Sequence, residues 1–301
     1  MPDLSSSARA GSDWSPLSDD QLAEFSERGY LHLRGLYSES EVHRGLAAMD
    51  EVVAANPSTL EHHESFYLND QTVRVRNAVA TTAGLDEFLD HPGLVGPLMT
   101  LLNGNVQILS TEVLVRYLQE DALEPWHTDG GPYLQRLRLM AESLPLQIKA
   151  QVFLSDVSRP NSGNFLLVPG SHLQVPTTLD YMCNIEELNE PLSRGEVPDH
   201  AVIVKAEPGD VLIFPHSLWH GVMANTTQPR KTFIFRFGQL WHRPYDYTVQ
   251  PREILDRMSP RLRRMFGDFG DGPHPSDYYK PLDQEETMAR GGSSALEVAS
   301  R

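Results

Sequence analysis

The sequence predicts a mainly β protein, a β-sandwich or barrel with helices packed against one outer face. The main observation is a change of character at Val106, after which short strand-like runs recur. Turn sequences such as Pro160-Asn161-Ser162-Gly163 and Pro208-Gly209-Asp210 separate the runs. Many short strands with turn-rich spacing are typical of sandwiches and barrels. The expected strands cover residues 106–118, 147–154, 164–168, 201–204, 210–214 and 232–237.

Helix signals dominate the segment before Val106. Ser18 with Gln21 three residues later forms a capping-box sequence, which predicts a helix that ends near Gly29. A second helix is expected from Ser38 to Ala55. Further helices are expected at residues 85–89, 92–103, 252–258 and 260–266, and short strands at residues 30–35 and 72–76.

Length and composition indicate one soluble globular unit. The chain has 301 residues, of which 40% are hydrophobic and 22% charged, so a sizeable core can form. Residues 1–16 are rich in Ser, Gly, Asp and Pro and are expected to be a disordered arm. Residues 17–288 are expected to be a single domain. The Gly- and Ser-rich residues 289–301 are expected to be a flexible tail.

Charge and cysteine content exclude several classes of protein. The net charge of −16 argues against nucleic acid or an anionic membrane as the main partner. Cys183 is the single cysteine, so no intrachain disulfide can form, as is usual in a reducing cytoplasm. The N-terminus lacks the apolar core of a signal peptide, and no stretch approaches a membrane span. We expect a cytoplasmic protein that acts on a small molecule. The sequence does not indicate its oligomeric state.

The tripeptide His127-Thr128-Asp129 is the strongest chemical signal. On an extended strand, residues i and i+2 point to the same side, so both side chains can reach one ion. A later histidine would complete a 2-His-1-carboxylate set, the ligands of non-haem Fe(II) oxygenases. His216 and His220 both follow an apolar strand, and one of the two is expected to be the third ligand.

Arginines near this segment are candidates for binding an acidic co-substrate. Arg230 lies ten residues after His220, at the start of an expected strand. A buried guanidinium pairs bidentately with a carboxylate. Arg236 has the same strand parity as Arg230 and is the reserve candidate. Arg76 is expected to share one strand face with Arg74 and could face the opening.

These motifs together resemble the phytanoyl-CoA dioxygenase family of Fe(II)- and 2-oxoglutarate-dependent oxygenases. The resemblance covers about residues 18–285. It rests on Trp126-His127-Thr128-Asp129, on the segment 164–172 that ends in Pro-Gly-Ser-His, and on the segment 209–221 that leads into Trp219-His220-Gly221. It continues through Asn225 to Arg230. The family often has Ser after the distal His-Gly, where this chain has Val222.

The resemblance implies a double-stranded β-helix (jelly-roll, cupin-like) core and assigns roles to site residues. It makes His127, Asp129 and His220 the catalytic iron ligands. It makes Arg230 the partner of the distal carboxylate of 2-oxoglutarate, with Gln151 at a strand position where family members often contact the co-substrate. Thr227 lies near Arg230 in the sequence, and its hydroxyl is a further candidate donor to the same carboxylate. The implied cofactors are Fe(II), 2-oxoglutarate and O2. Because Asp129 is retained, halogenation is not expected.

The expected activity is hydroxylation, or another oxidation, of an unactivated C–H bond with release of succinate and CO2. The expected substrate is a small molecule, such as a natural-product intermediate. The alternative is a metal-dependent, cupin-like isomerase or hydrolase that does not use 2-oxoglutarate. A third possibility is a small-molecule binder without turnover. Residues 175–198 are a candidate lid. The candidate pocket residues are Trp126, Tyr133, Phe153, Trp219 and Trp241.

Overall fold

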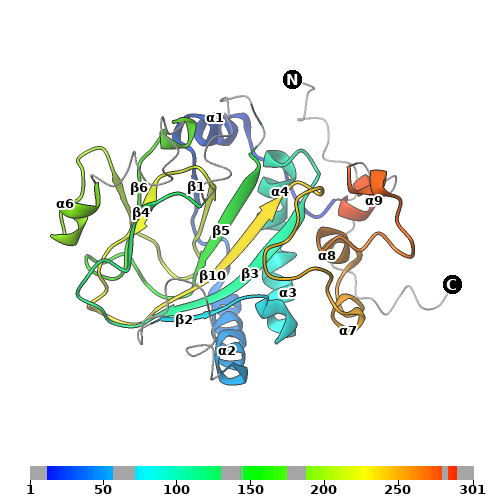
Figure 1. Ribbon diagram of the computed structural model, residues 1–301, viewed down its shortest axis with the longest axis horizontal. Helices are drawn as coiled ribbons and strands as arrows, with labels where there is room; N and C mark the ends of the chain where they lie inside the picture. The colour runs from blue at the N-terminus through cyan, green and yellow to red at the C-terminus, as the bar shows by residue number, and fades with distance from the viewer. Residues whose placement is uncertain are drawn as a thin grey trace.

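Two antiparallel sheets form the body of the protein in the computed structural model (Figure 1). The structure describes residues 12–56, 72–129, 143, 145–174, 188–279 and 284–289. The larger sheet has six strands in the order β1-β8-β5-β10-β3-β2, and the smaller has four in the order β4-β9-β6-β7. The prediction of a mainly β fold with flanking helices is confirmed.

The strands are short, as the turn-rich sequence predicts. The larger sheet contains β1 (Leu31–Leu33), β2 (Thr72–Val75), β3 (Gln107–Arg116), β5 (Gln147–Phe153), β8 (Val211–Pro215) and β10 (Arg230–Gly238). The smaller sheet contains β4 (Glu124–His127), β6 (Phe165–Leu167), β7 (Val202–Val204) and β9 (His220–Val222).

The helices begin where the sequence places their caps. In α1 (Asp19–Arg28) and α2 (Glu39–Ala55), the preceding serines, Ser18 and Ser38, each form a complete capping box. The remaining helices are α3 (Asp86–Leu89), α4 (Pro92–Leu101), α6 (Asn189–Ser193), α7 (Arg252–Leu255), α8 (Pro260–Met265) and α9 (Gln284–Ala289). Short 3-10 turns are η2 (Ala78–Ala80), η3 (Ala83–Leu85), η4 (Ser171–Leu173) and η6 (Pro275–Tyr278).

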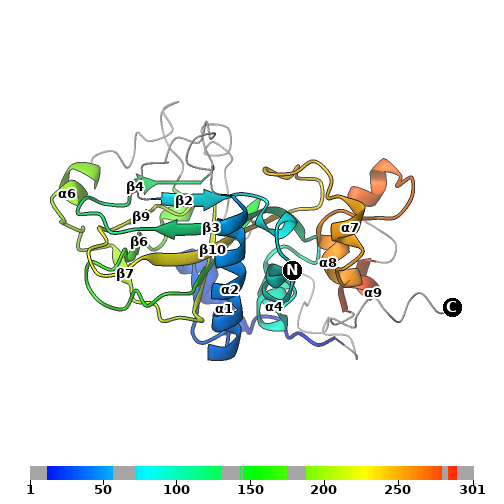
Figure 2. The same ribbon diagram turned by 90° about the horizontal axis from the view of Figure 1, so that it is seen from below.

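The two faces of the larger sheet differ in chemistry. One face packs against α2, α3 and α4 (Figure 2) and forms the main hydrophobic core, which includes Phe88, Val113, Val152, Phe233 and Phe235. Each such side chain contributes about 1.5–3 kcal/mol on burial. The other face looks toward the smaller sheet. Its alternate positions are mostly polar or charged: Arg74, Glu112, Arg116, Lys149, Gln151, Arg230, Thr232 and Arg236. Buried charge is costly unless it is paired or used, so this inner face is where a functional site is expected.

A second hydrophobic cluster closes part of the space between the sheets. It contains Phe153, Phe165, Leu212, Phe214 and Val222. On the far side of the smaller sheet, α6 packs Leu192 against Trp126 and Leu166. The interior is therefore lined by apolar side chains beneath the smaller sheet and by charged side chains along the larger one.

The two ends of the described chain meet at one buried arginine. Arg261 of α8 is fully buried and donates to Asp13 and Asp90. Trp14 is also buried, and its indole N–H donates to the carbonyl of Met288 in α9. The expected N-terminal arm therefore has an anchored end at residues 12–16, while residues 1–11 and 290–301 lie outside the described residues. Within the described part of the chain, no helix has both the length and the apolar character of a membrane span.

Candidate metal centre and co-substrate site

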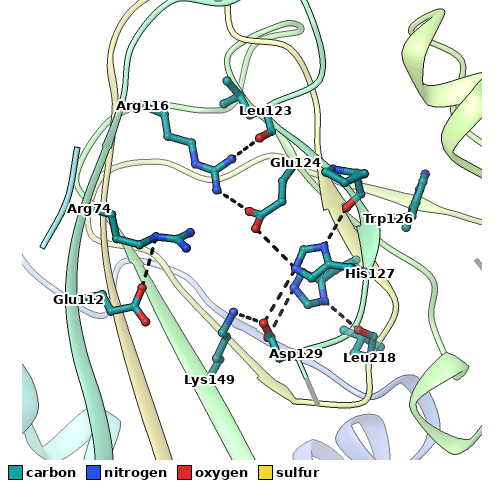
Figure 3. A network of polar contacts seen from close by, with 12 residues as sticks. Arg74, Glu112, Arg116, Leu123, Glu124, Trp126, His127, Asp129, Lys149 and Leu218 are labelled. Carbon is teal, nitrogen blue, oxygen red and sulfur yellow. Dashed lines mark hydrogen bonds and ion pairs between the residues drawn. The ribbon is translucent and has the colours of Figure 1, made fainter. Parts of the chain in front are cut away.

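Strand pairing in the smaller sheet brings the His-x-Asp segment to the distal histidine. β4 runs antiparallel to β9, and His127 lies directly opposite His220 in the register. The ring centroids of these histidines are 4.1 Å apart. One ligand atom from each of His127, Asp129 and His220 lies within 4.8 Å of the others (Figure 3). His127 and His220, from two paired strands, and Asp129, just after β4, thus converge as the sequence predicts.

Both histidines are held with one nitrogen facing the cluster. His127 Nδ1 lies 2.8 Å from the Pro125 carbonyl, and His220 Nδ1 lies 2.8 Å from the Leu218 carbonyl. A carbonyl only accepts, so each Nδ1 donates to its carbonyl and each Nε2 is left to face the cluster. This second hydrogen bond is the usual way in which a protein orients a metal-binding histidine.

Asp129 presents one satisfied oxygen and one free oxygen. Its Oδ1 accepts from Lys149 Nζ at 2.5 Å. Its Oδ2 is buried without a hydrogen-bond partner among the described residues, 3.5 Å from His220 Nε2. Burial raises the pKa of Asp129, but Lys149, His220 and Arg236 outweigh it and hold that pKa well below its usual range. Oδ2 is therefore an anionic oxygen that faces His220 Nε2, while Oδ1 lies 3.9 Å from His127 Nε2.

The electrostatics of His220 also favour a metal ligand. Burial and the neighbouring His127 lower the pKa of His220 to about 3, so its imidazole is neutral at pH 7. Two imidazoles and one carboxylate on one side of an ion would leave open positions for other ligands. The free Oδ2 of Asp129 and the two oriented Nε2 atoms fit a divalent iron ion.

His216, the other candidate for the third ligand, supports Asp129 through its backbone. Its carbonyl accepts from the Asp129 amide at 2.8 Å. The His216 imidazole is buried, and burial lowers its pKa to about 4. The cluster contains His220 and does not contain His216. Next to His220, the amide of Trp219 donates to the Ser171 hydroxyl at 2.9 Å, so the Pro-Gly-Ser-His turn positions the β9 strand.

Arg230 forms a second centre of unsatisfied polar groups. The residue is 1% exposed, and its Nε and Nη2 atoms lack hydrogen-bond partners in the part of the chain described here. Its guanidinium lies 5.7 Å from the ring centre of Phe153. Burial and the neighbouring Arg116 lower the pKa of Arg230 to about 9, so the side chain remains cationic at pH 7. A buried, unpaired cation of this kind fits an acidic ligand.

A glycine makes room for the Arg230 side chain. Gly163 has φ +73°, a left-handed conformation that favours glycine. A Cβ at this position would lie 2.7 Å from Arg230 Cδ. The turn 160–163, read from the sequence only as a strand boundary, therefore also determines where the arginine lies.

Other polar groups on the inner face also lack partners. Gln151 Nε2 and Thr232 Oγ1 are buried without hydrogen-bond partners among the described residues. Gln151 is one of the residues predicted from the sequence, and Thr232 was missed although it shares strand parity with Arg230. Thr227 is exposed, and its hydroxyl donates to Asn225 Oδ1 at 3.5 Å.

Glu124 links the arginine region to the metal ligands (Figure 3). It receives a short hydrogen bond from Arg116, which lies directly opposite Arg230 in the sheet. The other Glu124 oxygen, Oε1, lies 3.7 Å from His127 Nε2. Burial raises the pKa of Glu124, but Arg116 and His127 hold it well below its usual range. A carboxylate therefore stands between the buried arginines and the metal ligands.

The predicted aromatic pocket residues have different environments. Trp126 and Phe153 are fully buried and belong to the hydrophobic clusters. Trp241 is 48% exposed, and Trp219 is partly buried. Tyr133 and residues 175–187 of the predicted lid lie outside the described residues.

The family model described as "Phytanoyl-CoA dioxygenase (PhyH)" matches residues 25–233, which is more than half of the chain. Dioxygenase olcK of Penicillium canescens is 23% identical over 274 residues, which cover 88% of this chain and 85% of that protein. Ectoine dioxygenase of Bordetella bronchiseptica is 26% identical over 273 residues, with coverages of 78% and 80%.

Solved structures support the same fold. HygX from Streptomyces hygroscopicus, crystallised with nickel and 2-oxoglutarate, aligns with a TM-score of 0.60 and 22% identity over 78% of this chain and 90% of that chain. The 2-oxoglutarate-dependent carbocyclase SnoK from nogalamycin biosynthesis aligns with a TM-score of 0.57 and 22% identity over 74% and 85%. The expected jelly-roll fold is confirmed. Fe(II) and 2-oxoglutarate, the cofactor and co-substrate expected from the sequence, are those of the matched family. The chain belongs to the phytanoyl-CoA dioxygenase family and is a non-haem iron dioxygenase.

Proposed function

We propose that this dioxygenase hydroxylates, or otherwise oxidises, an unactivated C–H bond of a small natural-product intermediate and releases succinate and CO2. One observation carries the proposal. The ligand atoms of His127, Asp129 and His220 lie together, and the same interior holds the buried, unpaired Arg230. A metal site alone would not need that arginine, whereas a dianionic co-substrate would.

The position of each site residue indicates its role in the proposed reaction. His127, Asp129 and His220 hold Fe(II), which supplies the oxygen-activating chemistry when it is bound. Arg230 binds the distal carboxylate of 2-oxoglutarate through charge-assisted hydrogen bonds. Gln151 and Thr232 have unpaired buried polar atoms on the same face and provide further hydrogen bonds. Thr227 remains a prediction, with its hydroxyl in an exposed turn.

The apolar cluster beneath the smaller sheet excludes water from the reacting groups. Phe165 and Phe214 pack against His220, with ring centroids 5.2 Å and 5.1 Å away. Exclusion of water by these apolar side chains strengthens the ionic contacts inside the site and protects reactive species from side reactions.

The proposed substrate class draws on the solved relatives. HygX has been crystallised with hygromycin B, and SnoK and the epimerase SnoN come from nogalamycin biosynthesis. SnoK is described as a carbocyclase and SnoN as an epimerase, so ring closure is an alternative outcome for this chain. Substrate-stimulated succinate formation across a panel of candidate molecules, with product analysis, would distinguish the outcomes.

Anaerobic spectroscopy tests the co-substrate assignment. Fe(II) and 2-oxoglutarate added without O2 should give a weak visible charge-transfer band in the wild type. Arg230→Ala and His127→Ala should lose the band, whereas Arg159→Ala, which removes an exposed arginine, should keep it. Absence of the band in the wild type, or its survival in both site variants, would contradict the proposal.

A further inference from the structure

The inner face of the larger sheet carries more positive than negative charge. Among the described residues, five cationic side chains of this face belong to one electrostatic network: Arg74, Arg116, Lys149, Arg230 and Arg236. Arg76, beyond the end of β2, is exposed to solvent. Four carboxylates face them: Glu112, Glu124, Asp129 and Asp246. One positive charge is therefore in excess. A divalent metal and dianionic 2-oxoglutarate add equal and opposite charges, so the excess persists when both are bound.

Most of the carboxylates are already engaged elsewhere. Glu124 pairs with Arg116, and Asp129 pairs with Lys149. Asp246 accepts from the amides of Asn77 and Thr111 and from the Ser110 hydroxyl. These contacts leave Glu112 as the main counter-ion for the remaining arginines.

Glu112 is shared between two guanidinium groups. Its Oε2 lies 3.6 Å from Arg74 Nε, and its Oε1 lies 3.6 Å from Arg236 Nε. Both distances exceed a hydrogen bond, and both Nε atoms lack hydrogen-bond partners in the described structure. Arg236 Nη2 also lies 3.7 Å from Asp129 Oδ1. Arg236 thus stands beside a metal ligand without a direct carboxylate hydrogen bond.

Arg236 also borders an aromatic rim that reaches the surface. Its guanidinium lies 5.6 Å from the ring centre of Tyr245. Tyr245 is 5.9 Å from His242, which stacks on Trp241 at 5.7 Å with an interplanar angle of 3°. Tyr245 and Trp241 are 50% and 48% exposed. A continuous path of aromatic side chains therefore leads from solvent to Arg236 and the metal ligands.

Arg236 and Arg230 are too far apart to hold one co-substrate. They are six residues apart on β10, which corresponds to roughly 20 Å along an extended strand. 2-Oxoglutarate is a five-carbon diacid, and Arg230 suits its distal carboxylate. Arg236 is then free for a different anion on the side of the metal that faces the aromatic rim.

We propose that Arg236 binds a carboxylate of the primary substrate, so that the substrate is an organic acid whose remaining part contacts Tyr245 and Trp241. The inference rests on the proposed function, because it places the substrate relative to the metal ligands. A guanidinium recognises a carboxylate bidentately, and adjacent aromatic rings favour a planar or apolar body. Lys149 adds positive charge beside this carboxylate-binding site while it remains hydrogen-bonded to Asp129.

Binding of benzoate and benzamide tests the carboxylate-binding site at Arg236. The metal-loaded protein with 2-oxoglutarate is titrated anaerobically with each probe, and tryptophan fluorescence and the visible band are followed. The wild type should bind benzoate saturably and at least tenfold more tightly than benzamide. Arg236→Met should weaken benzoate binding at least tenfold and leave benzamide binding unchanged. Arg243→Met, which removes an exposed arginine between Trp241 and Tyr245, is the matched control and should behave as the wild type.

The binding results and the visible band test the carboxylate-binding site and the proposed function separately. Equal affinity for the two probes, no binding of benzoate, or full benzoate affinity in Arg236→Met would overturn the proposal of a carboxylate-binding site at Arg236. Tighter binding of phenyl phosphate than of benzoate would overturn the choice of a carboxylate. If the wild type bound benzoate through Arg236 but gave no band with Fe(II) and 2-oxoglutarate, the carboxylate-binding site would be supported and the proposed function would be refuted. A band that survives in Arg236→Met is expected, because Arg230 holds the co-substrate.

Discussion

Lys149 Nζ lies 2.5 Å from Asp129 Oδ1, and Oδ2 is the Asp129 oxygen that has no hydrogen-bond partner among the described residues. The two residues come from different strands, since Lys149 lies on β5 of the larger sheet and Asp129 follows β4 of the smaller sheet. The lysine therefore ties the two sheets together at the metal ligands. Its contact with Oδ1 would hold the orientation of the Asp129 carboxylate when a metal ion is bound.

Lys149→Met should lower metal affinity about 10–100-fold, the usual cost of losing a group that orients a metal ligand. Methionine keeps much of the side-chain length but removes the hydrogen bond, so the Asp129 carboxylate is free to rotate. Titration of the apo protein with Fe(II) or Co(II) under anaerobic conditions measures the effect. Lys205→Met removes an exposed lysine and serves as the control. Unchanged affinity in Lys149→Met would show that Asp129 is oriented without the lysine.

Gly163→Ala should weaken 2-oxoglutarate binding by displacing Arg230. The new Cβ would lie 2.7 Å from Arg230 Cδ, so the side chain must move. Calorimetric titration of 2-oxoglutarate against the metal-loaded variant should show at least a tenfold higher Kd.

Gly195→Ala separates this steric effect from backbone strain. Gly195 has a similar positive φ of +75°, but a Cβ there has no atom within 4 Å. Both variants should therefore lose about 1 kcal/mol of stability from the left-handed backbone. Only Gly163→Ala should lose co-substrate affinity, and equal Kd values in the two variants would refute the steric explanation.

Local signals made the helix starts and the clustering of His127, Asp129 and His220 predictable. The capping boxes at Ser18 and Ser38 define helix starts through hydrogen bonds within a few residues. The His127-x-Asp129 spacing and the family motifs indicated which side chains converge, although β4 and β9 are only four and three residues long. Pairing between those short strands, with His127 opposite His220, is what brings the ligands together.

Other parts of the site depend on contacts between distant strands. Lys149 sits in an otherwise ordinary β5 sequence, and nothing nearby in the chain indicates that it reaches Asp129. Thr232 and Gln151 face the interior only because β5 and β10 pair in the observed register. The sharing of Glu112 between Arg74 and Arg236 likewise requires three strands to be placed side by side. Strand register is not encoded within any one of these segments.

His172→Gln should reduce the loss of stability on acidification. Burial lowers the pKa of His172 in the folded protein below the ordinary value of 6.5. The unfolded chain therefore binds the proton more readily, and stability falls as pH drops below about 6.5 until the folded pKa is reached. The slope from one histidine is at most about 1.4 kcal/mol per pH unit. Urea unfolding at pH 7.5, 6.5 and 5.5 measures the difference between the wild type and the variant. That difference should shift in favour of the variant at low pH, and a constant difference would contradict the prediction.

Arg261→Met should be among the more destabilising single changes away from the site. Arg261 is fully buried, donates to Asp90 on one side and to Asp13 on the other, and lies near the Met288 carbonyl. Removing one partner of a buried ion pair typically costs about 3–5 kcal/mol, because the remaining carboxylate is left without a counter-charge. Chemical denaturation should show a loss of this size, whereas Arg252→Met, whose parent side chain is 58% exposed, should change stability by about 1 kcal/mol or less. Since Arg261 lies in α8 and outside the metal cluster, the folded variant should bind metal with wild-type affinity. A stability loss no larger than that of Arg252→Met would mean that the packing of Trp14 and α9 anchors the chain ends without the ion pairs.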